Sequence, residues 1–127
     1  MKTILVDAVD TFVIEGEGIY KPLYELLETY PDKKIILTNA NDEQMIKFGL
    51  TNLPYELFTL KHNPDKVDRT YFQKMLEHFQ LKVDDVVYFE HNLEAVKSAQ
   101  SVGITSYHYD SQKKDMESLK SFIDTNL

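Results

Sequence analysis

The feature that most constrains the fold is an apolar segment that runs directly into a carboxylate. Ile4, Leu5 and Val6 precede Asp7 with no polar residue between them. Such an uninterrupted run is typical of a parallel β-strand that is covered on both faces. Ligands of open α/β sheets bind outside the carboxyl ends of the strands, which is where Asp7 would emerge. We therefore expect Asp7 in a functional site; the simpler alternative is a carboxylate that caps a helix or anchors a loop.

Apolar strands alternate with helical patterns along the rest of the chain. Further strands are expected at residues 34–38, 57–60, 84–89 and 104–107, and helices at residues 19–30, 42–48, 68–79, 93–102 and 111–124, with a loop or small flap at residues 14–18. This order predicts a mostly parallel sheet of about five strands, with right-handed crossovers and helices on both faces. We expect a single three-layer, Rossmann-like α/β domain over residues 1–127.

Polar residues stand at the points where several of these strands end. They are Asp7, Thr38, Asn39, Glu90, His91 and His108. Because the carboxyl ends of parallel strands meet at one edge of a sheet, these side chains are expected to converge in one crevice. By contrast, His62 and His78 are expected at the surface or only partly packed.

Composition excludes several classes of function. The chain has 127 residues, of which 43% are hydrophobic, and this is enough for one domain with a core. Its net charge of −7 argues against nucleic-acid binding by a basic surface. No window holds the roughly 18 apolar residues of a membrane span. The lack of a signal peptide and of cysteine fits a reducing, cytoplasmic compartment and excludes disulfides and thiolate metal sites.

Two segments in the first third of the chain resemble motifs of the haloacid dehalogenase-like superfamily, a group that consists mostly of phosphatases. Residues 7–12, Asp-Ala-Val-Asp-Thr-Phe, fit the family's Asp-x-Asp-Gly-Thr-Leu frame without a gap. Thr38 and Asn39 follow an apolar strand, as a Ser or Thr, often with an Asn, does in the second motif.

Two later segments extend the resemblance over essentially the whole chain. Lys66 precedes a predicted helix, as the lysine of the family's third motif does. Glu90 and His91 end a strand where the fourth motif has an acidic pair, and Gly103 closes the following helix. Each motif alone is weak, but four in order at strand ends are specific for the fold.

The resemblance implies a role for each matching residue. Asp7 would be the nucleophile that forms an acyl-phosphate, which splits one displacement into two easier steps. Thr38 would donate a hydrogen bond to the transferred group, and Lys66 would neutralise charge on the nucleophile and the phosphoryl oxygens. Asn39 and Asn92 would bind the substrate.

The resemblance also implies a Mg²⁺ site, formed by Asp7 and the acidic pair, because Mg²⁺ prefers oxygen ligands. Here Glu90 supplies one carboxylate, whereas His91 is a poor ligand for Mg²⁺ and a good one for zinc. A weakened Mg²⁺ site is therefore expected. One alternative is a transition-metal site that includes His91 and His108; another is a plain ion pair between Glu90 and Lys66.

Three departures from the family pattern bear on catalysis. The position of the general acid and base is Val9, which cannot transfer a proton, and such help is typically worth about 10²–10⁴-fold in rate. Asp10 lies one residue later and is expected to point elsewhere unless the turn is reshaped. The segments between Asp7 and Thr38, and between Thr38 and Lys66, are too short for a cap domain, so the site should be open to water.

The sequence thus leaves several functions open. The first is a capless hydrolase with a reduced site that binds a phosphorylated or other anionic small molecule, with weak or atypical catalysis. The second is a non-catalytic protein that kept the fold to bind a protein partner, and a homo-oligomer is also possible. A metal-independent 2-haloacid dehalogenase is less favoured, because Ala95 replaces an Asp of that group and the helical cap is missing. A receiver-type signalling domain would need a phospho-accepting Asp after the third strand, and none is present.

Overall fold

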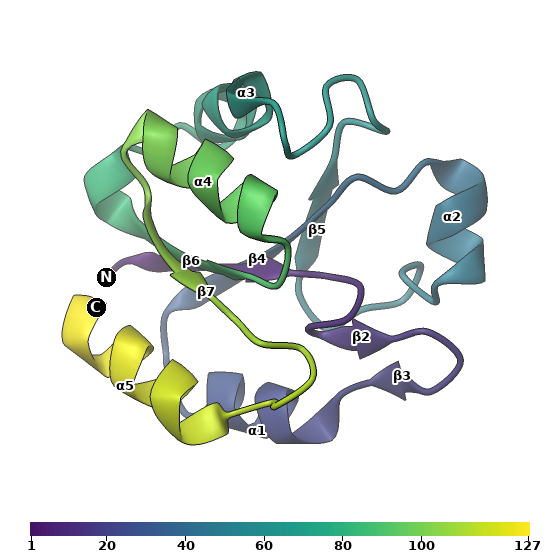
Figure 1. Cartoon of the computed structure of the whole chain (residues 1–127), viewed down its shortest axis with the longest axis horizontal. Helices are drawn as coiled ribbons and strands as arrows, with labels where there is room; N and C mark the ends of the chain where they lie inside the picture. The colour runs from purple at the N-terminus through teal and green to yellow at the C-terminus, as the bar shows by residue number, and fades with distance from the viewer.

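The computed structural model describes all residues 1–127 and has a five-stranded sheet at its centre (Figure 1). The strands lie in the order β5-β4-β1-β6-β7 and all pairs are parallel. Their bounds are β1 (Thr3–Asp7), β4 (Lys33–Thr38), β5 (Glu56–Thr59), β6 (Val86–Glu90) and β7 (Thr105–His108). A separate antiparallel hairpin is formed by β2 (Val13–Ile14) and β3 (Gly18–Ile19). The predicted sheet of about five parallel strands is confirmed.

β1 is the central strand, and all five of its residues are buried. It pairs with β4 on one side and β6 on the other, so that Val6 lies between Ile36 and Phe89. The chain first builds outward from β1 through β4 to β5, and then crosses back to add β6 and β7 on the other side. A ligand crevice forms where the direction of such connections reverses, and here that point lies at the carboxyl end of β1.

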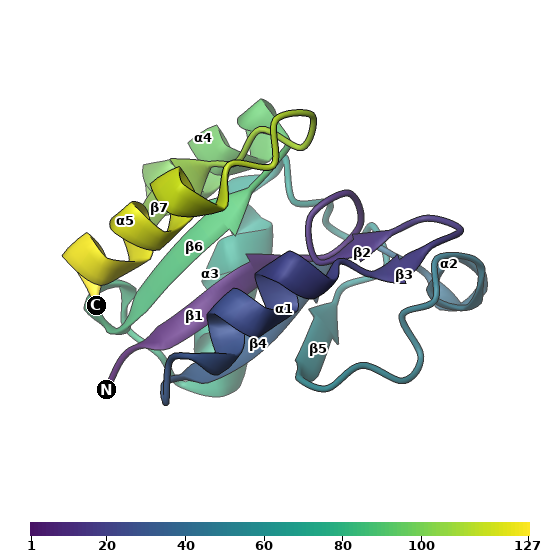
Figure 2. The ribbon, with the colours of Figure 1, turned by 90° about the horizontal axis from the view of Figure 1, so that it is seen from below.

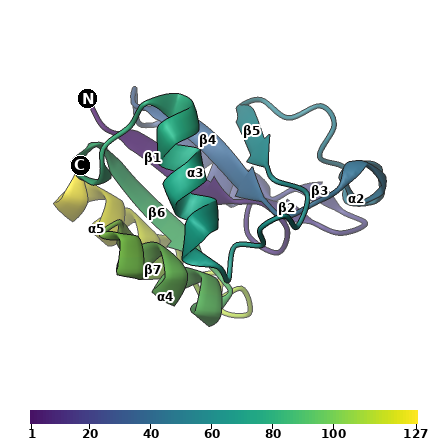
Figure 3. The ribbon, with the colours of Figure 1, turned by 90° about the horizontal axis from the view of Figure 1, so that it is seen from above.

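Helices cover both faces of the sheet, as predicted. α1 (Lys21–Glu28) and α5 (Met116–Asn126) lie on one face, which Figure 2 shows in front. α3 (Arg69–Phe79) and α4 (Leu93–Val102) lie on the other face, which is in front in Figure 3. Alternate side chains of β1 follow the two-residue period of a strand: Ile4 and Val6 join the core under α1 and α5, and Leu5 joins the core under α3.

Most element bounds agree with the sequence patterns, and the differences have local causes. The first helix begins at Lys21, because Ile19 belongs to β3. Residues 83–85 form a 3₁₀ turn, so the strand that follows is shorter than predicted. The last helix begins at Met116 instead of residue 111, since the Asp110 carboxylate accepts hydrogen bonds from two backbone N–H groups and forms a turn first.

The carboxyl end of the sheet carries only small additions. Between β1 and α1 the chain forms just the β2–β3 hairpin, and between β4 and α3 it forms α2 (Asp42–Lys47), β5 and loops. Figures 1 and 2 place α2 and the hairpin at this same end. The absence of a cap domain between these elements agrees with the prediction from segment length. No helix has the length and apolar character needed to cross a bilayer.

Candidate functional site

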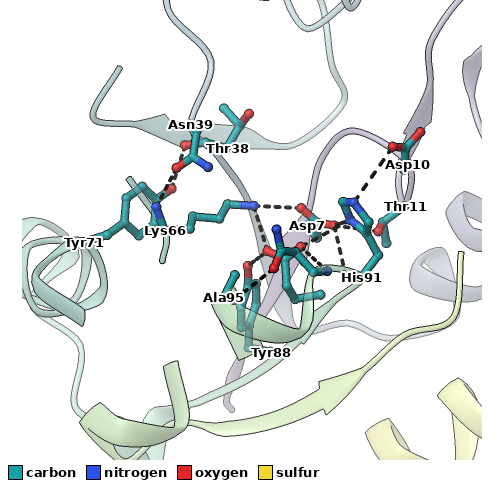
Figure 4. A network of polar contacts seen from close by, with 12 residues as sticks. Asp7, Asp10, Thr11, Thr38, Asn39, Lys66, Tyr71, Tyr88, His91 and Ala95 are labelled. Atoms are coloured by element: carbon teal, nitrogen blue, oxygen red, sulfur yellow. Dashed lines mark hydrogen bonds and ion pairs between the residues drawn. The ribbon is translucent and has the colours of Figure 1, made fainter. Parts of the chain in front are cut away.

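All of the polar residues predicted at the strand ends except His108 line one cavity of about 160 Å³. Figure 4 shows Asp7 and His91 side by side, with the Lys66 side chain reaching toward Asp7 from the other side. Thr38, Asn39, Glu90 and Asn92 also line the cavity. Residues far apart in the sequence therefore meet at the carboxyl end of the sheet, as expected from the strand order.

Asp7 is almost completely buried, with 2% of its surface exposed, and both of its carboxylate oxygens accept hydrogen bonds. Oδ1 accepts from Lys66 Nζ at 2.7 Å. Oδ2 accepts from the Thr11 hydroxyl at 2.7 Å, from the His91 ring at 2.5 Å and from the His91 backbone N–H at 3.3 Å. Asp7 is thus the centre of a network that includes Thr11, a contact that the sequence interpretation missed.

Lys66 supplies a buried positive charge between two carboxylates. Its Nζ donates to Asp7 Oδ1 at 2.7 Å and to Glu90 Oε1 at 2.9 Å. Its backbone N–H donates to Asn39 Oδ1 at 2.7 Å, which ties the start of the following segment to the end of β4. The ion pair between Lys66 and Glu90 that was considered as an alternative is therefore present, and it includes Asp7.

Glu90 is held by its own strand and by the turn that follows. Its Oε1 also accepts from the hydroxyl of Tyr88, and its Oε2 accepts from the Asn92 backbone N–H at 3.1 Å. Tyr88 and Glu90 are two residues apart on β6 and therefore point to the same face of the sheet. This two-residue spacing was the available signal for Tyr88, which the sequence interpretation did not use.

His91 lies between the buried carboxylates and the solvent. Its Nδ1 is 2.5 Å from Asp7 Oδ2 and 3.3 Å from Glu90 Oε2, and its Nε2 is 3.9 Å from Asp10 Oδ2. Asp10 does not line the cavity, but the turn that carries it is reshaped. Asp10 adopts a left-handed backbone conformation with φ of 68°, and this turn directs its carboxylate toward the ring, as Figure 4 shows.

These contacts set the charge of the site. Burial alone would raise the pKa of Asp7, but Lys66 and the hydrogen bonds from His91 hold it well below its usual range. Burial would likewise lower the pKa of Lys66, but Asp7 and Glu90 outweigh it and raise that pKa. Hydrogen bonds to Asp7 and Glu90 raise the pKa of His91 to about 10. At neutral pH Asp7 is therefore ionised, and Lys66 and His91 are positively charged.

The remaining predicted residues have more local roles. Thr38 Oγ1 accepts from the Ala40 backbone N–H at 3.2 Å, and the Thr38 carbonyl accepts from the buried hydroxyl of Tyr71. Asn92 is the N-cap of α4, where its Oδ1 accepts from the N–H groups of Glu94 and Ala95. Substrate binding by Asn39 and Asn92 stays a prediction.

Two further histidines lie near the site, and His62 is exposed at the surface, as expected. His62 lines the cavity, where its ring contacts Gln44 Oε1 at 2.6 Å and Asp65 Oδ2 at 3.0 Å. No sequence pattern predicted this, because it depends on how α2 folds over the end of the sheet. His108 does not join the carboxylates, since its Nε2 lies 3.0 Å from the backbone carbonyl of His91. The proposed metal pair of His91 and His108 is therefore not formed.

Five of the residues that line the cavity are apolar. They are Val9, Ala40, Phe48, Val67 and Ala95. Val67 is 55% exposed, so the apolar lining includes a residue at the protein surface. A ligand in the cavity would therefore meet both charged groups and apolar side chains.

Asp7, Glu90 and His91 are the residues placed to hold a metal, with ligand atoms within 4.8 Å of one another. Their arrangement differs from an all-oxygen Mg²⁺ site. All four carboxylate oxygens already accept from N–H or O–H donors, and one of the three candidate ligands is an imidazole, which suits softer metals. The carboxylate oxygens expected to bind Mg²⁺ therefore already accept hydrogen bonds from groups of the protein.

Solved structures with the same arrangement of elements come from several bacteria. A variant of a HAD family enzyme from Bacteroides thetaiotaomicron, in complex with magnesium and inorganic phosphate, matches with a TM-score of 0.70 and 12% sequence identity over 87% of this chain and 95% of that chain. A haloacid dehalogenase-like protein of unknown function from Agrobacterium tumefaciens matches with a TM-score of 0.60 and 18% identity over 84% of this chain and 60% of that chain. The chain has the haloacid dehalogenase-like fold.

The core domain of a candidate phosphoglycolate phosphatase from Streptococcus pneumoniae shares this haloacid dehalogenase-like fold. It matches with a TM-score of 0.62 and 14% identity over 98% of this chain and 96% of that chain. No protein-family model and no curated protein sequence matches the chain. The fold that the four short motifs indicate is thus confirmed by comparison of three-dimensional structures. The sequence identities to these structures are only 12–18%.

Proposed function

We propose that the chain is a haloacid dehalogenase-like hydrolase with a reduced active site, which binds phosphate or a similar oxyanion beside Asp7. The observation that carries this proposal is the buried Lys66, whose Nζ lies 2.7 Å from an ionised Asp7 at the carboxyl end of the central strand. A cation in this place offsets the repulsion between a carboxylate and an incoming anion. The Bacteroides enzyme of the same fold, solved with magnesium and phosphate, supports an anion as the ligand.

Three groups would bind the anion, and each has a donor to offer. Lys66 contributes its ammonium group, which has three N–H donors, of which Asp7 and Glu90 use two. Thr38 uses its Oγ1 as an acceptor for Ala40, which leaves its O–H to donate. Asn39 uses its amide oxygen for Lys66, which leaves its NH₂ group. The volume of about 160 Å³ suits a group of the size of a phosphate at the charged end.

Catalysis at this site would be weak or atypical. Asp7 is ionised and would attack phosphorus through Oδ1, since Oδ2 accepts three hydrogen bonds. Val9 cannot protonate the leaving group, which would cost about 10²–10⁴-fold in rate. An activated aryl phosphate needs little such help, because its leaving group departs as a stable anion. We therefore expect slow turnover of aryl phosphates and little of alkyl phosphates.

A second candidate function is a non-catalytic module that binds a protein partner over the open cavity. It is favoured by the engagement of both Asp7 oxygens with protein donors, and by the apolar residues in the cavity lining, of which Val67 is exposed. In this case the network around Asp7 would serve stability alone.

Turnover of p-nitrophenyl phosphate by the wild type and by Asp7→Asn separates the two functions. A hydrolase predicts slow release of nitrophenol by the wild type and none by a folded Asp7→Asn. Equal inactivity of the two folded proteins would favour the binding module. Release of chloride from 2-chloropropionate, measured in parallel, tests the dehalogenase alternative, for which none is expected.

Binding is tested separately by titration calorimetry with inorganic phosphate, with and without Mg²⁺. We expect one site per chain, weakened in Thr38→Val, which keeps the shape of the side chain and removes its donor. Absence of binding by the folded wild type under both conditions would contradict the proposed function.

A further inference from the structure

Two positively charged groups bridge the same two carboxylates. Lys66 Nζ contacts one oxygen of each, Asp7 Oδ1 at 2.7 Å and Glu90 Oε1 at 2.9 Å. His91 Nδ1 faces the other oxygen of each, Asp7 Oδ2 at 2.5 Å and Glu90 Oε2 at 3.3 Å. The pair of carboxylates is therefore closed on one side by an ammonium and on the other by an imidazole.

The His91 ring is close enough to both carboxylates to interact with each. Its Nδ1 lies within hydrogen-bond distance of Asp7 Oδ2, at 2.5 Å, and within ion-pair distance of Glu90 Oε2, at 3.3 Å. The imidazole itself stands between the oxygens that would otherwise face a metal.

The ring of His91 meets carboxylates on both sides. Nδ1 faces Asp7 and Glu90, and Nε2 is 3.9 Å from the exposed carboxylate of Asp10. Nδ1 has an acceptor at hydrogen-bond distance, and the Asp10 carboxylate lies at ion-pair distance from Nε2, so negative groups on both sides favour the positively charged ring. The left-handed turn at Asp10 thus places a further negative group behind the ring.

The charge that His91 brings to the site can be compared with the charge at the same place in the family motif. In the motif that residues 90–92 resemble, a second carboxylate and a divalent cation together contribute one positive charge, and a protonated His91 contributes the same. We infer that His91 takes the place of the magnesium ion as a built-in cation, so that the Asp7 cavity binds its oxyanion without a divalent metal. This inference rests on the proposed oxyanion site, which it extends by naming the cation.

The first test is a titration of the wild-type protein with Mg²⁺, Mn²⁺ and Zn²⁺ in turn, followed by calorimetry with inorganic phosphate in the presence of EDTA. We expect no stoichiometric metal binding, and a phosphate affinity that is the same within about twofold with Mg²⁺ or with EDTA. Metal binding that is lost in Asp7→Asn would overturn the inference, as would phosphate binding that EDTA abolishes. If phosphate fails to bind under every condition, the proposed function fails, while the metal titration still decides the role of His91.

The second test restores a carboxylate with His91→Asp. This variant should gain Mg²⁺ binding at one site per chain, with a rise of several degrees in melting temperature when Mg²⁺ is added. The matched control is His108→Asp, which adds the same charge at the end of the neighbouring strand, outside the carboxylate cluster. Equal Mg²⁺ responses of the two variants would contradict the inference.

If His91→Asp does not fold without metal, His91→Ala provides the same test. It removes the ring and leaves two carboxylates that share only Lys66. Mg²⁺ should then raise its melting temperature and leave that of the wild type unchanged. A Mg²⁺ response of the wild type as large as that of His91→Ala would overturn the inference.

Discussion

Lys66 carries a positive charge that is buried between the carboxylates of Asp7 and Glu90. Removal of one partner of a buried ion pair leaves an uncompensated charge and typically costs about 3–5 kcal/mol. We expect Lys66→Met to lower the free energy of unfolding by about this amount, as measured by urea denaturation at pH 7.

The control for this variant is Lys61→Met. Lys61 pairs with Asp42 at 3.1 Å, but both side chains are more than half exposed. Exposed pairs contribute little, so we expect a change within about 0.5 kcal/mol. A similar loss in the two variants would mean that burial of Lys66 is not the source of its effect.

Residues at strand ends were the most predictable part of the site. Asp7, Thr38 and Glu90 each follow a continuous apolar run, and a parallel sheet brings such ends together whatever the intervening chain does. The contact of His62 with the cavity and that of Asp10 with His91 were not predictable in this way. His62 depends on long-range packing of α2, and Asp10 depends on a left-handed turn in a place where the family frame has a glycine.

At the scale of elements, α4 connects the stability of the fold to the site. Its N-cap is Asn92, whose Oδ1 accepts two backbone hydrogen bonds, and the same residue lines the cavity. Asn92→Ala should therefore lower the free energy of unfolding by about 0.5–2 kcal/mol. Asn92→Ser keeps a capping oxygen and should restore most of that stability.

Phosphate titration of the same two variants tests whether the amide of Asn92 binds the substrate. If it does, Asn92→Ser will be nearly as stable as the wild type but will bind phosphate more weakly. Wild-type affinity in Asn92→Ser would limit the role of Asn92 to the cap.

Helix starts were harder to predict than helix existence. Residues 93–102 were predicted as a helix and form α4 with the same bounds, since Asn92 and Gly103 provide both ends. The last helix was expected from residue 111, but two capping carboxylates lie in succession there. Asp110 closes a turn and Asp115 caps the helix. The sequence alone does not show which of the two carboxylates begins the helix.

At the scale of the whole molecule, the charged groups around Asp7 make the stability of the fold depend on pH. The pKa of His91 rises from 6.5 in the unfolded chain to about 10 in the folded protein. The stability that the charged ring adds to the folded state is therefore complete below pH 6.5 and is lost as the pH rises toward 10. We expect the free energy of unfolding to fall between pH 7 and pH 9.5, a range that lies below the ordinary pKa of tyrosine.

Urea denaturation of the wild type and of His91→Gln at pH 6.5, 8 and 9.5 measures this dependence. His91→Gln should be less stable at pH 6.5, and the difference from the wild type should shrink as the pH rises. His108→Gln should keep the wild-type slope, because the carboxylate cluster is intact. A constant difference between His91→Gln and the wild type would show that the ring does not carry a charge in this site.

The central claim is that Lys66, Thr38 and Asp7 form an oxyanion site at the end of the central strand. Its most direct test is a crystal structure of the wild-type protein grown with tungstate, in which the tungsten position is found by anomalous scattering. We predict tungsten in the Asp7 cavity, with its oxygens within hydrogen-bond distance of Lys66 Nζ and Thr38 Oγ1. Tungstate bound only elsewhere, with the contact between Lys66 and Asp7 unchanged, would contradict the account.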